Sequence, residues 1–304
     1  MRPLTKKKPK SWSAKPLLLT KMISGVVISA AIILSIFFFK LAWLLMVGLL
    51  SVIGTWELAR MLNKRGHRVS TILPMVLNAL LLISLYFLVD SDYSATVADW
   101  NISHAQVLAW QNMFVLFSAL TLILRTPFLR PRATVLELFA PLFQMAYLGW
   151  FPSFFILLRA LPGGSFFLVW GLTVVAFSDI GAYFAGKFLG KRPYFQHLSP
   201  NKTLEGSVGG ILASVGIAWA LAYFIGDYLP VSGIHITVLA VSMACLGQMG
   251  DLLESMIKRD MQVKDSGTWL PGFGGLLDRI DSYLFLAPFM YYYLINFVLI
   301  QPIP

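Results

Sequence analysis

Charged residues are scarce in this chain. Only 12% of its 304 residues are charged and 58% are apolar, whereas soluble domains carry about 25% charged residues. Too little polar surface remains to cover a water-soluble globule of this size, which excludes a cytosolic enzyme and a disordered chain. The single cysteine, Cys245, cannot form an internal disulfide, which excludes a disulfide-stapled secreted module. The composition therefore predicts an integral membrane protein.

Long apolar runs are abundant. A helix needs roughly 20 apolar residues to cross a hydrocarbon layer about 30 Å thick. Nine runs come near that length: 22–39, 41–59, 71–89, 106–124, 134–158, 164–186, 207–226, 233–257 and 283–301. Pro141, Gly149 and Pro152 predict that the fifth run is kinked or ends early, and eight spans with one re-entrant run remain an alternative. We predict an all-α polytopic protein with about nine transmembrane helices.

The basic residues indicate the orientation. Of the 24 lysines and arginines, 22 lie before the first run or after the second, fourth, sixth and eighth runs. Only Lys40 and Arg159 fall on the other side. The connections on that side carry Asp90, Asp92, Asp99 and Asp227. Because cytoplasmic loops are rich in Lys and Arg, we predict a cytoplasmic N-terminus and an exterior C-terminus.

The same pattern divides the chain into three expected parts. We expect residues 1–21 to form a basic cytoplasmic segment and 22–160 to hold about five N-terminal transmembrane helices. Residues 161–304 form a C-terminal transmembrane region, in which we expect a functional site at the cytoplasmic face. We interpret the basic run near residues 6–10 as a topology anchor that contacts anionic lipid, and expect no nucleic-acid partner. Short loops and compact length indicate a bacterial plasma (inner) membrane. The sequence leaves open whether the protein is a homodimer.

The eighth run carries a polar stripe. On a helix, Asp251, Glu254, Ser255 and Lys258 share one face. Lipid cannot accept such a stripe, so it must face protein, water or a ligand. Lining an ion path is the alternative to lining a reaction site. Glu57 and Glu137, in the N-terminal half, favour structural roles; for Glu57, a local pair with Arg60 is the simplest explanation.

A glycine-rich turn and two further acids follow. In residues 271–275, a Pro-Gly-Phe-Gly-Gly turn permits unusual dihedral angles and exposes amide hydrogens. Asp278 and Asp281 then share a helix face, with Arg279 beside them. Two carboxylates near a helix start suit Mg²⁺ held together with substrate phosphates, and the basic residues suit the phosphates themselves. A solvated helix start is the plain alternative.

The sixth and seventh runs add a second polar group. Ser178 and Asp179 lie deep in an apolar helix, although Asp179 could simply bond to a neighbouring helix. A small-residue face that includes Gly181 and Ala185 predicts close helix packing. The loop at 199–206 then leads into a glycine-rich helix start, without the glycine spacing of a Walker A loop.

These motifs resemble the phosphatidate cytidylyltransferase (CDP-diacylglycerol synthase) family. The resemblance covers the whole chain in span count and order, and is most specific in residues 178–210 and 247–282. The matching stretches are Trp56-Glu57, Ser178-Asp179-x-Gly181-Ala182-Tyr183, Ser199-Pro200-x-Lys202-Thr203-x-Glu205-Gly206, Gly247-Gln-x-Gly250-Asp251-x-x-Glu254-Ser255, Lys258-Arg259, Lys264-Asp265 and Asp278-Arg279-Ile280-Asp281. One residue departs from the pattern: Phe273 stands where the family usually has His.

The resemblance implies a Mg²⁺-dependent reaction of CTP with phosphatidate that gives CDP-diacylglycerol and pyrophosphate. It implies that Asp251 and Asp278 bind the metal directly, with Glu254 and Asp281 as further ligands. A second cation, monovalent or divalent, is left open. The implied catalytic residues are Asp251, Asp278, Asp281, Lys258 and Arg279. The implied substrate-binding residues are Asp179, Lys202, Thr203, Glu205, Ser255, Arg259, Lys264, Gly274 and Gly275.

Two other functions remain alternatives. The intramembrane acids would also suit a transporter or channel, but they gather at one predicted end of the bundle rather than along its full depth. Because of the Phe273 departure, a divergent or low-activity family member that acts on another lipid phosphate is the second alternative.

Overall fold

The computed structural model describes residues 25, 27, 29–89, 104–129, 132–195, 198–199, 202–229, 231–267 and 274–299. Within these ranges the chain is helical, as predicted, with one isolated β-bridge between Pro193 and Thr203. The elements are α2 (Lys40–Lys64), α3 (Ile72–Val89), α5 (His104–Leu129), α6 (Val135–Met145), η1 (Ala146–Trp150), α7 (Phe151–Ala160), α8 (Gly164–Leu189), α9 (Leu204–Ile225), η2 (Gly226–Tyr228), α10 (Gly233–Asp260), α11 (Leu277–Leu284), α12 (Leu286–Tyr293) and η3 (Leu294–Val298).

Seven of the described helical segments are long and apolar enough to cross a membrane, and a shorter apolar helix spans Ser29–Phe38. The continuous helix from α6 through α7 counts as one of the seven. The last predicted run, 283–301, falls on three short elements, α11, α12 and η3. The all-α, multi-pass membrane architecture is therefore confirmed, while the count of nine and the orientation of the termini stay predictions.

The fifth run does not end early. It begins at a capping box, in which Thr134 and Glu137 satisfy each other's backbone amides. Pro141 lies inside α6, and the helix then widens into the π-helical turn η1 before α7 continues. A π-turn is a recognised way to absorb a local disturbance in a helix. Gly149 in this turn makes room for Asn78, whose amide a Cβ at that position would overlap.

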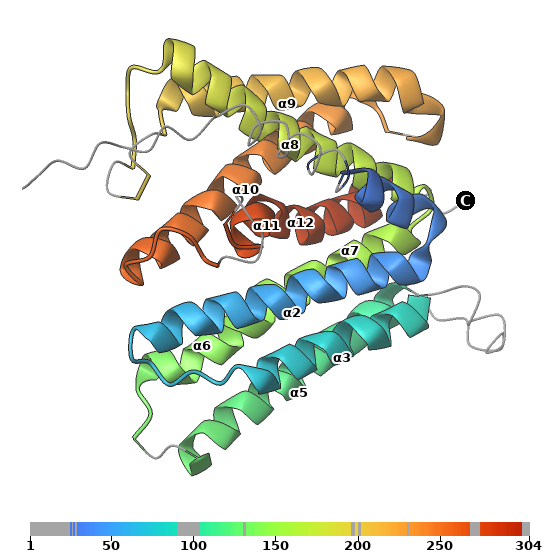
Figure 1. The fold of residues 1–304 in the computed structure, drawn as a ribbon. Coiled ribbons are helices and arrows are strands. Elements are labelled where there is room, and N and C mark those ends of the chain that lie inside the picture. The colour runs from blue at the N-terminus through green and yellow to red at the C-terminus, as the bar shows by residue number, and fades with distance from the viewer. Residues whose placement is uncertain are drawn as a thin grey trace, which may run out of the picture.

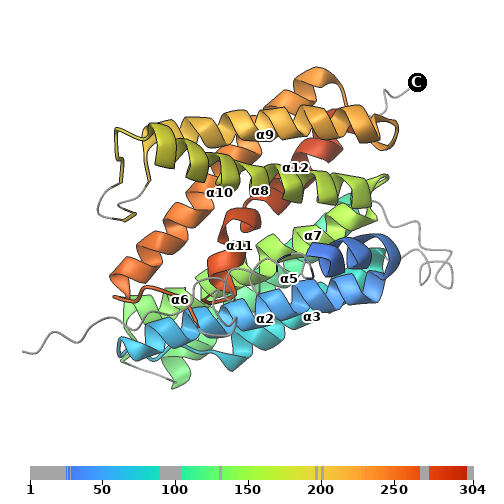
Figure 2. The ribbon, with the colours of Figure 1, turned by 45° about the horizontal axis from the view of Figure 1, so that its top comes forward.

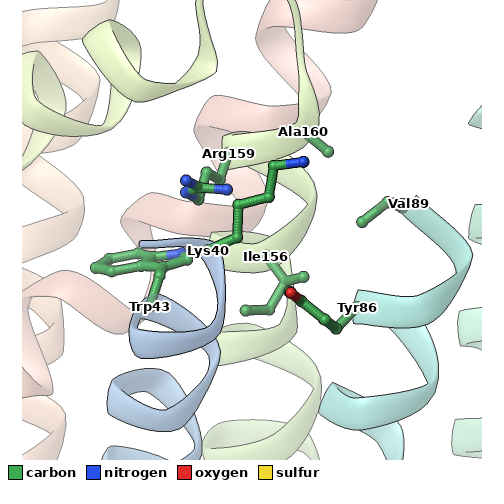
Figure 3. Close-up of a pocket in the computed structure, with 7 residues that line it drawn as sticks. All are labelled: Lys40, Trp43, Tyr86, Val89, Ile156, Arg159 and Ala160. Atoms are coloured by element: carbon green, nitrogen blue, oxygen red, sulfur yellow. The ribbon is translucent and has the colours of Figure 1, made fainter. Parts of the chain in front are cut away.

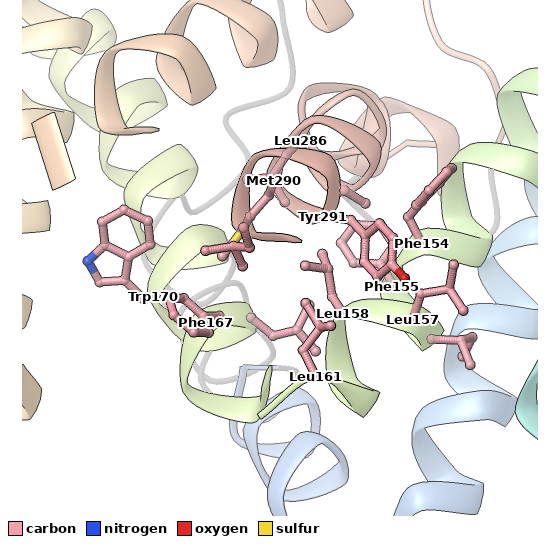
Figure 4. Close-up of a cluster of buried hydrophobic side chains, with 14 of the residues drawn as sticks. Phe154, Phe155, Leu157, Leu158, Leu161, Phe167, Trp170, Leu286, Met290 and Tyr291 are labelled. Carbon is pink, nitrogen blue, oxygen red and sulfur yellow. The ribbon is translucent and has the colours of Figure 1, made fainter. Parts of the chain in front are cut away.

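The helices form two groups with a central layer between them. Figures 1 and 2 show α8 and α9 on one side, α2, α3, α5 and α6 on the other, and α11 and α12 between them. Figure 4 shows the contact at the centre, where Met290 and Tyr291 of α12 meet Phe154 of α7 and Phe167 of α8. Lipid tails are as apolar as these side chains, so close van der Waals packing stabilises this contact.

The predicted small-residue face on α8 is confirmed. A Cβ on Gly181 would overlap Ala213 of α9, and a Cβ on Gly209 would overlap Ala185 of α8. The two backbones therefore approach more closely than larger side chains would allow. This packing fixes the connection between α8 and α9 beside α10, where the polar stripe lies.

Candidate active site

Three carboxylates from two distant stretches of the chain meet. Asp251 and Glu254 lie one turn apart on α10, and Asp281 lies on α11. One carboxylate oxygen from each residue lies within 4.8 Å of the others. Glu254 and Asp281 are buried and Asp251 is half-buried. We call these three residues the acid group.

Gly250 lets the two helices come together. A Cβ at this position would overlap the backbone carbonyl of Asp281. The overlap involves backbone, which cannot swing aside as the end of a flexible side chain can. The glycine therefore sets the distance between α10 and α11, and with it the geometry of the acid group.

The acid group fits a divalent cation. Three carboxylates in this space repel one another unless a positive charge lies among them. Oε1 of Glu254 is buried and accepts no hydrogen bond within the described part of the chain, which is costly for an ionised oxygen. Carboxylate oxygens are the ligands that hard cations such as Mg²⁺ prefer.

Two lysines flank the acid group. Nζ of Lys202, at the start of the α9 region, lies 2.8 Å from Oδ2 of Asp251. Nζ of Lys258, on α10, donates to Glu254 and lies 2.7 Å from Oδ1 of Asp278. The site therefore has ammonium groups from two segments next to its carboxylates, an arrangement that suits phosphate groups beside a cation.

Asp278 lies outside the acid group. Besides Lys258, its carboxylate accepts hydrogen bonds from the amides of Ser266, at 3.0 Å, and Gly275, at 2.9 Å. Burial raises the pKa of Asp278, but hydrogen bonding with Glu254, Lys258 and Gly275 outweighs it and lowers the pKa to about 2. Asp278 comes one turn before Asp281 on α11, and its carboxylate contacts both Lys258 of α10 and the loop that precedes α11.

Glu57 is the residue that sequence reasoning underrated. It is fully buried, and it accepts hydrogen bonds from the Leu277 amide at 2.8 Å, the Leu276 amide at 3.1 Å and Ser266 Oγ at 3.3 Å. The expected pair with Arg60 does not form; the Arg60 guanidinium instead lies 4.9 Å from the centre of the Trp56 ring. The backbone amides at the start of a helix lack partners within that helix, so they donate hydrogen bonds to the buried Glu57 carboxylate and stabilise its charge. The signal in the sequence was an acidic residue near the end of an otherwise apolar run, 41–59.

The segment between α8 and α9 is fixed by its own polar residues. The Thr203 hydroxyl oxygen accepts a hydrogen bond from the Gly206 amide at 3.1 Å and so caps the start of α9. Glu205 accepts the amides of Lys191 and Arg192, at 3.0 and 3.1 Å. These two predicted substrate-binding residues thus hold the loop that carries Lys202, rather than joining the acid group.

The other predicted residues surround the acid group. Asp179 on α8 interacts electrostatically with Asp251 and Lys202. Ser255 donates to Asp251 over 3.5 Å, and Arg259 donates to the Leu198 carbonyl at 3.2 Å, which ties α10 to the α8–α9 connection.

The remaining predictions concern the loop before α11. Gly274 has a φ of +89°, a conformation that favours glycine. The backbone amide of Gly275 donates a hydrogen bond to the Asp278 carboxylate. Lys264 and Arg279 are exposed at the rim. Phe273 lies outside the described residues, so its effect stays a prediction.

Fold and site together define a multi-pass membrane protein whose carboxylates and lysines gather where two helices and two connections meet. Residues 19–297 match the cytidylyltransferase family. The chain belongs to this family, and it is therefore an enzyme that transfers a nucleotidyl group from CTP.

Relatives support the assignment. The chain is 34% identical over 278 residues to the phosphatidate cytidylyltransferase of Bacillus subtilis, an alignment that covers 91% of this chain and 97% of the relative. It is 40% identical over 160 residues to the phosphatidate cytidylyltransferase of Staphylococcus aureus. That alignment covers 53% of this chain and 58% of the relative.

Proposed function

We propose that this protein joins CTP and phosphatidate to form CDP-diacylglycerol and pyrophosphate in the bacterial plasma membrane. The observation that carries the proposal is the acid group with its flanking lysines, in a chain whose full-length relative is a phosphatidate cytidylyltransferase. The acids suit a cation and the lysines suit phosphates, which is what two phosphorylated substrates require.

The reaction needs no nucleophile from the protein. An ionised phosphate oxygen of phosphatidate attacks the α-phosphorus of CTP, a new P–O bond forms, and the bond to the β-phosphate oxygen breaks. Pyrophosphate leaves with the electron pair. The protein therefore has to hold two anions together and to stabilise the charge that develops during transfer.

Each part of the site then has a role. Asp251, Glu254 and Asp281 would hold a divalent cation, Mg²⁺ in our proposal. When bound, that ion supplies charge neutralisation for the phosphates. Lys202 and Lys258 bind phosphate oxygens and keep the two substrates in register.

The remaining residues support this arrangement. Asp278 orients Lys258 and the loop before α11. The exposed Arg259, Lys264 and Arg279 bring the anionic nucleotide to the site from solution.

The test is release of pyrophosphate by the purified full chain, given CTP, phosphatidate and Mg²⁺. Asp281→Asn should lower turnover at least 100-fold, because it removes one anionic ligand from the acid group. Asp260→Asn is the matched control, since Asp260 is an exposed acid at the end of the same helix α10, and it should keep normal turnover. Substantial release by Asp281→Asn would contradict the proposal.

Two substrate series make the test specific. ATP, GTP and UTP should not replace CTP, and other lipid phosphates should be poorer acceptors than phosphatidate. Faster release with a different lipid phosphate would assign the chain to another acceptor within the same family.

A further inference from the structure

Uncharged polar side chains gather inside the membrane-spanning part of three helices. Thr55 of α2, Asn78 of α3 and Gln144 of α6 are each 0% exposed. Nδ2 of Asn78 donates to Oγ1 of Thr55 at 3.1 Å and lies 3.5 Å from the carbonyl oxygen of Gln144. The three helices therefore meet at these residues, which we call the polar cluster.

The polar cluster lies away from the surface. The pocket shown in Figure 3 is lined by Lys40, Trp43 and Arg159, among others, near the start of α2. Thr55 lies about four turns, or roughly 22 Å, further along the same helix. Because the three side chains of the cluster are fully buried, neither lipid nor bulk solvent contacts them.

Three atoms of the polar cluster have no hydrogen-bond partner within the described residues. They are Oδ1 of Asn78 and both amide atoms of Gln144, Oε1 and Nε2. The Thr55 hydroxyl is satisfied, since it donates to the carbonyl of Ser51 at 2.7 Å. A buried amide group without a partner is costly, and in a membrane no surrounding solvent can relieve that cost. The cluster therefore needs two further donors and one further acceptor.

The neighbouring helix turn accounts for the missing donors. The π-helical turn η1 begins two residues after Gln144, and such a turn shifts the backbone hydrogen bonds of a helix. The Ser51 hydroxyl donates to the Leu148 carbonyl in this turn. A Cβ on Gly149 would overlap Oδ1 of Asn78, so this oxygen packs against the turn. The donors of Ser51 and Asn78 are directed elsewhere and do not serve the side-chain oxygens.

We propose that the polar cluster binds ordered water inside the membrane-spanning region. Water can donate to Oδ1 of Asn78 and Oε1 of Gln144, and it can accept from Nε2. Buried waters typically make about three hydrogen bonds to polar groups that lack other partners. An ion fits less well, because no charged side chain in the cluster would balance its charge. The water is then a structural part of the contact among α2, α3 and α6, and the site is independent of the proposed reaction.

The direct experiment is a crystal structure of the full chain grown in a lipidic mesophase, at a resolution that shows ordered water. Solvent density should lie within hydrogen-bonding distance of Oδ1 of Asn78 and of the Gln144 amide. The same density should be missing in Gln144→Met. Ordered Asn78 and Gln144 side chains without solvent density beside them would overturn the proposal.

Thermal unfolding in detergent gives an independent measurement. Gln144→Met keeps the approximate volume of the side chain and removes both amide atoms. If water is bound, the variant loses its hydrogen bonds to that water, and the midpoint of unfolding should fall by about 3 °C or more. If no water is bound, the substitution removes two unpaired buried atoms and the midpoint should rise. A rise would overturn the proposal.

Two further variants make the result specific. Gln144→Asn keeps a donor and an acceptor and leaves room for more water, so it should lose less stability than Gln144→Met. The opposite order would overturn the proposal, because volume rather than hydrogen bonding would then decide stability at this position. Gln262→Met makes the same chemical change at an exposed residue, and its midpoint should stay within about 1 °C of the wild-type value.

Discussion

Lys258 connects the two acidic parts of the site. Its ammonium lies between Glu254 of α10 and Asp278 of α11, and all three side chains are largely shielded from water. A charge in such a place is favourable only while its partners remain, because a buried ion left alone is far more costly than an exposed one. The residue therefore acts on stability as well as on substrate binding.

Replacing Lys258 with Met should lower the free energy of unfolding by about 3 kcal/mol, since two shielded carboxylates lose their counter-charge. Thermal unfolding in detergent would measure the loss. The double variant Lys258→Met, Glu254→Gln should recover part of it, because one of the stranded charges is removed. Full stability of Lys258→Met alone would show that the ion pairs contribute little.

Single residues show where sequence reasoning stops. The spacing of Asp251 and Glu254 predicts a shared helix face, and the structure confirms it. Asp281 belongs to the acid group, whereas Asp278 binds Lys258 and the loop before α11. This difference depends on the direction that α11 takes after the glycine turn, which the sequence does not specify. Glu57 contacts residues more than 200 positions away. The sequence shows its near neighbour Arg60, but it does not show which distant residues pack against it.

At the scale of elements, the contact between α10 and α11 at Gly250 leaves no room for a larger side chain. Gly250→Ala should lower turnover about 100-fold, because its Cβ meets the Asp281 carbonyl and displaces an acid-group residue by up to about 1 Å. Gly216→Ala on α9 is the control, since a Cβ there meets open space, and it should be neutral. The initial rate of pyrophosphate release compares the two. Equal rates would mean that α11 tolerates displacement.

The start of α11 is held by a helix remote in sequence. Glu57→Gln should destabilise the protein by about 1–3 kcal/mol, because the amide retains one acceptor where several donors converge. It should also raise the Mg²⁺ concentration needed for half-maximal turnover, an effect that general loss of stability would not produce.

Glu137→Gln serves as the control for Glu57. Glu137 occupies the N3 position of a capping box, where Gln also functions, so its metal requirement should stay normal. If Glu57→Gln also needs only the normal Mg²⁺ concentration for half-maximal turnover, then Glu57 has a structural role and does not affect metal binding.

At the scale of the whole molecule, the lengths of the apolar runs predicted most of the described architecture. Each described long helix corresponds to one apolar run, because backbone hydrogen bonding in lipid leaves few alternatives. The π-turn in the fifth run and the division of the last run into α11, α12 and η3 were not predictable. Both depend on which neighbours pack there, such as Asn78 against Gly149.

The predicted orientation can be tested with reporters. An activity reporter fused after residue 304 should read exterior, because nine spans from a cytoplasmic N-terminus end outside. The same reporter fused after Gly66, in the connection between α2 and α3, should read cytoplasmic. A cytoplasmic reading from the C-terminal fusion would remove one span from the predicted topology.

The central claim is that Asp251, Glu254 and Asp281 together hold one divalent cation. The most direct measurement is Mn²⁺ binding to the purified protein, followed by electron paramagnetic resonance as free Mn²⁺ disappears. We predict one tight site per chain in wild-type protein and in Asp260→Asn, and at least a tenfold loss of affinity in Glu254→Gln and in Asp281→Asn. Unchanged Mn²⁺ affinity in both of these variants would contradict the account.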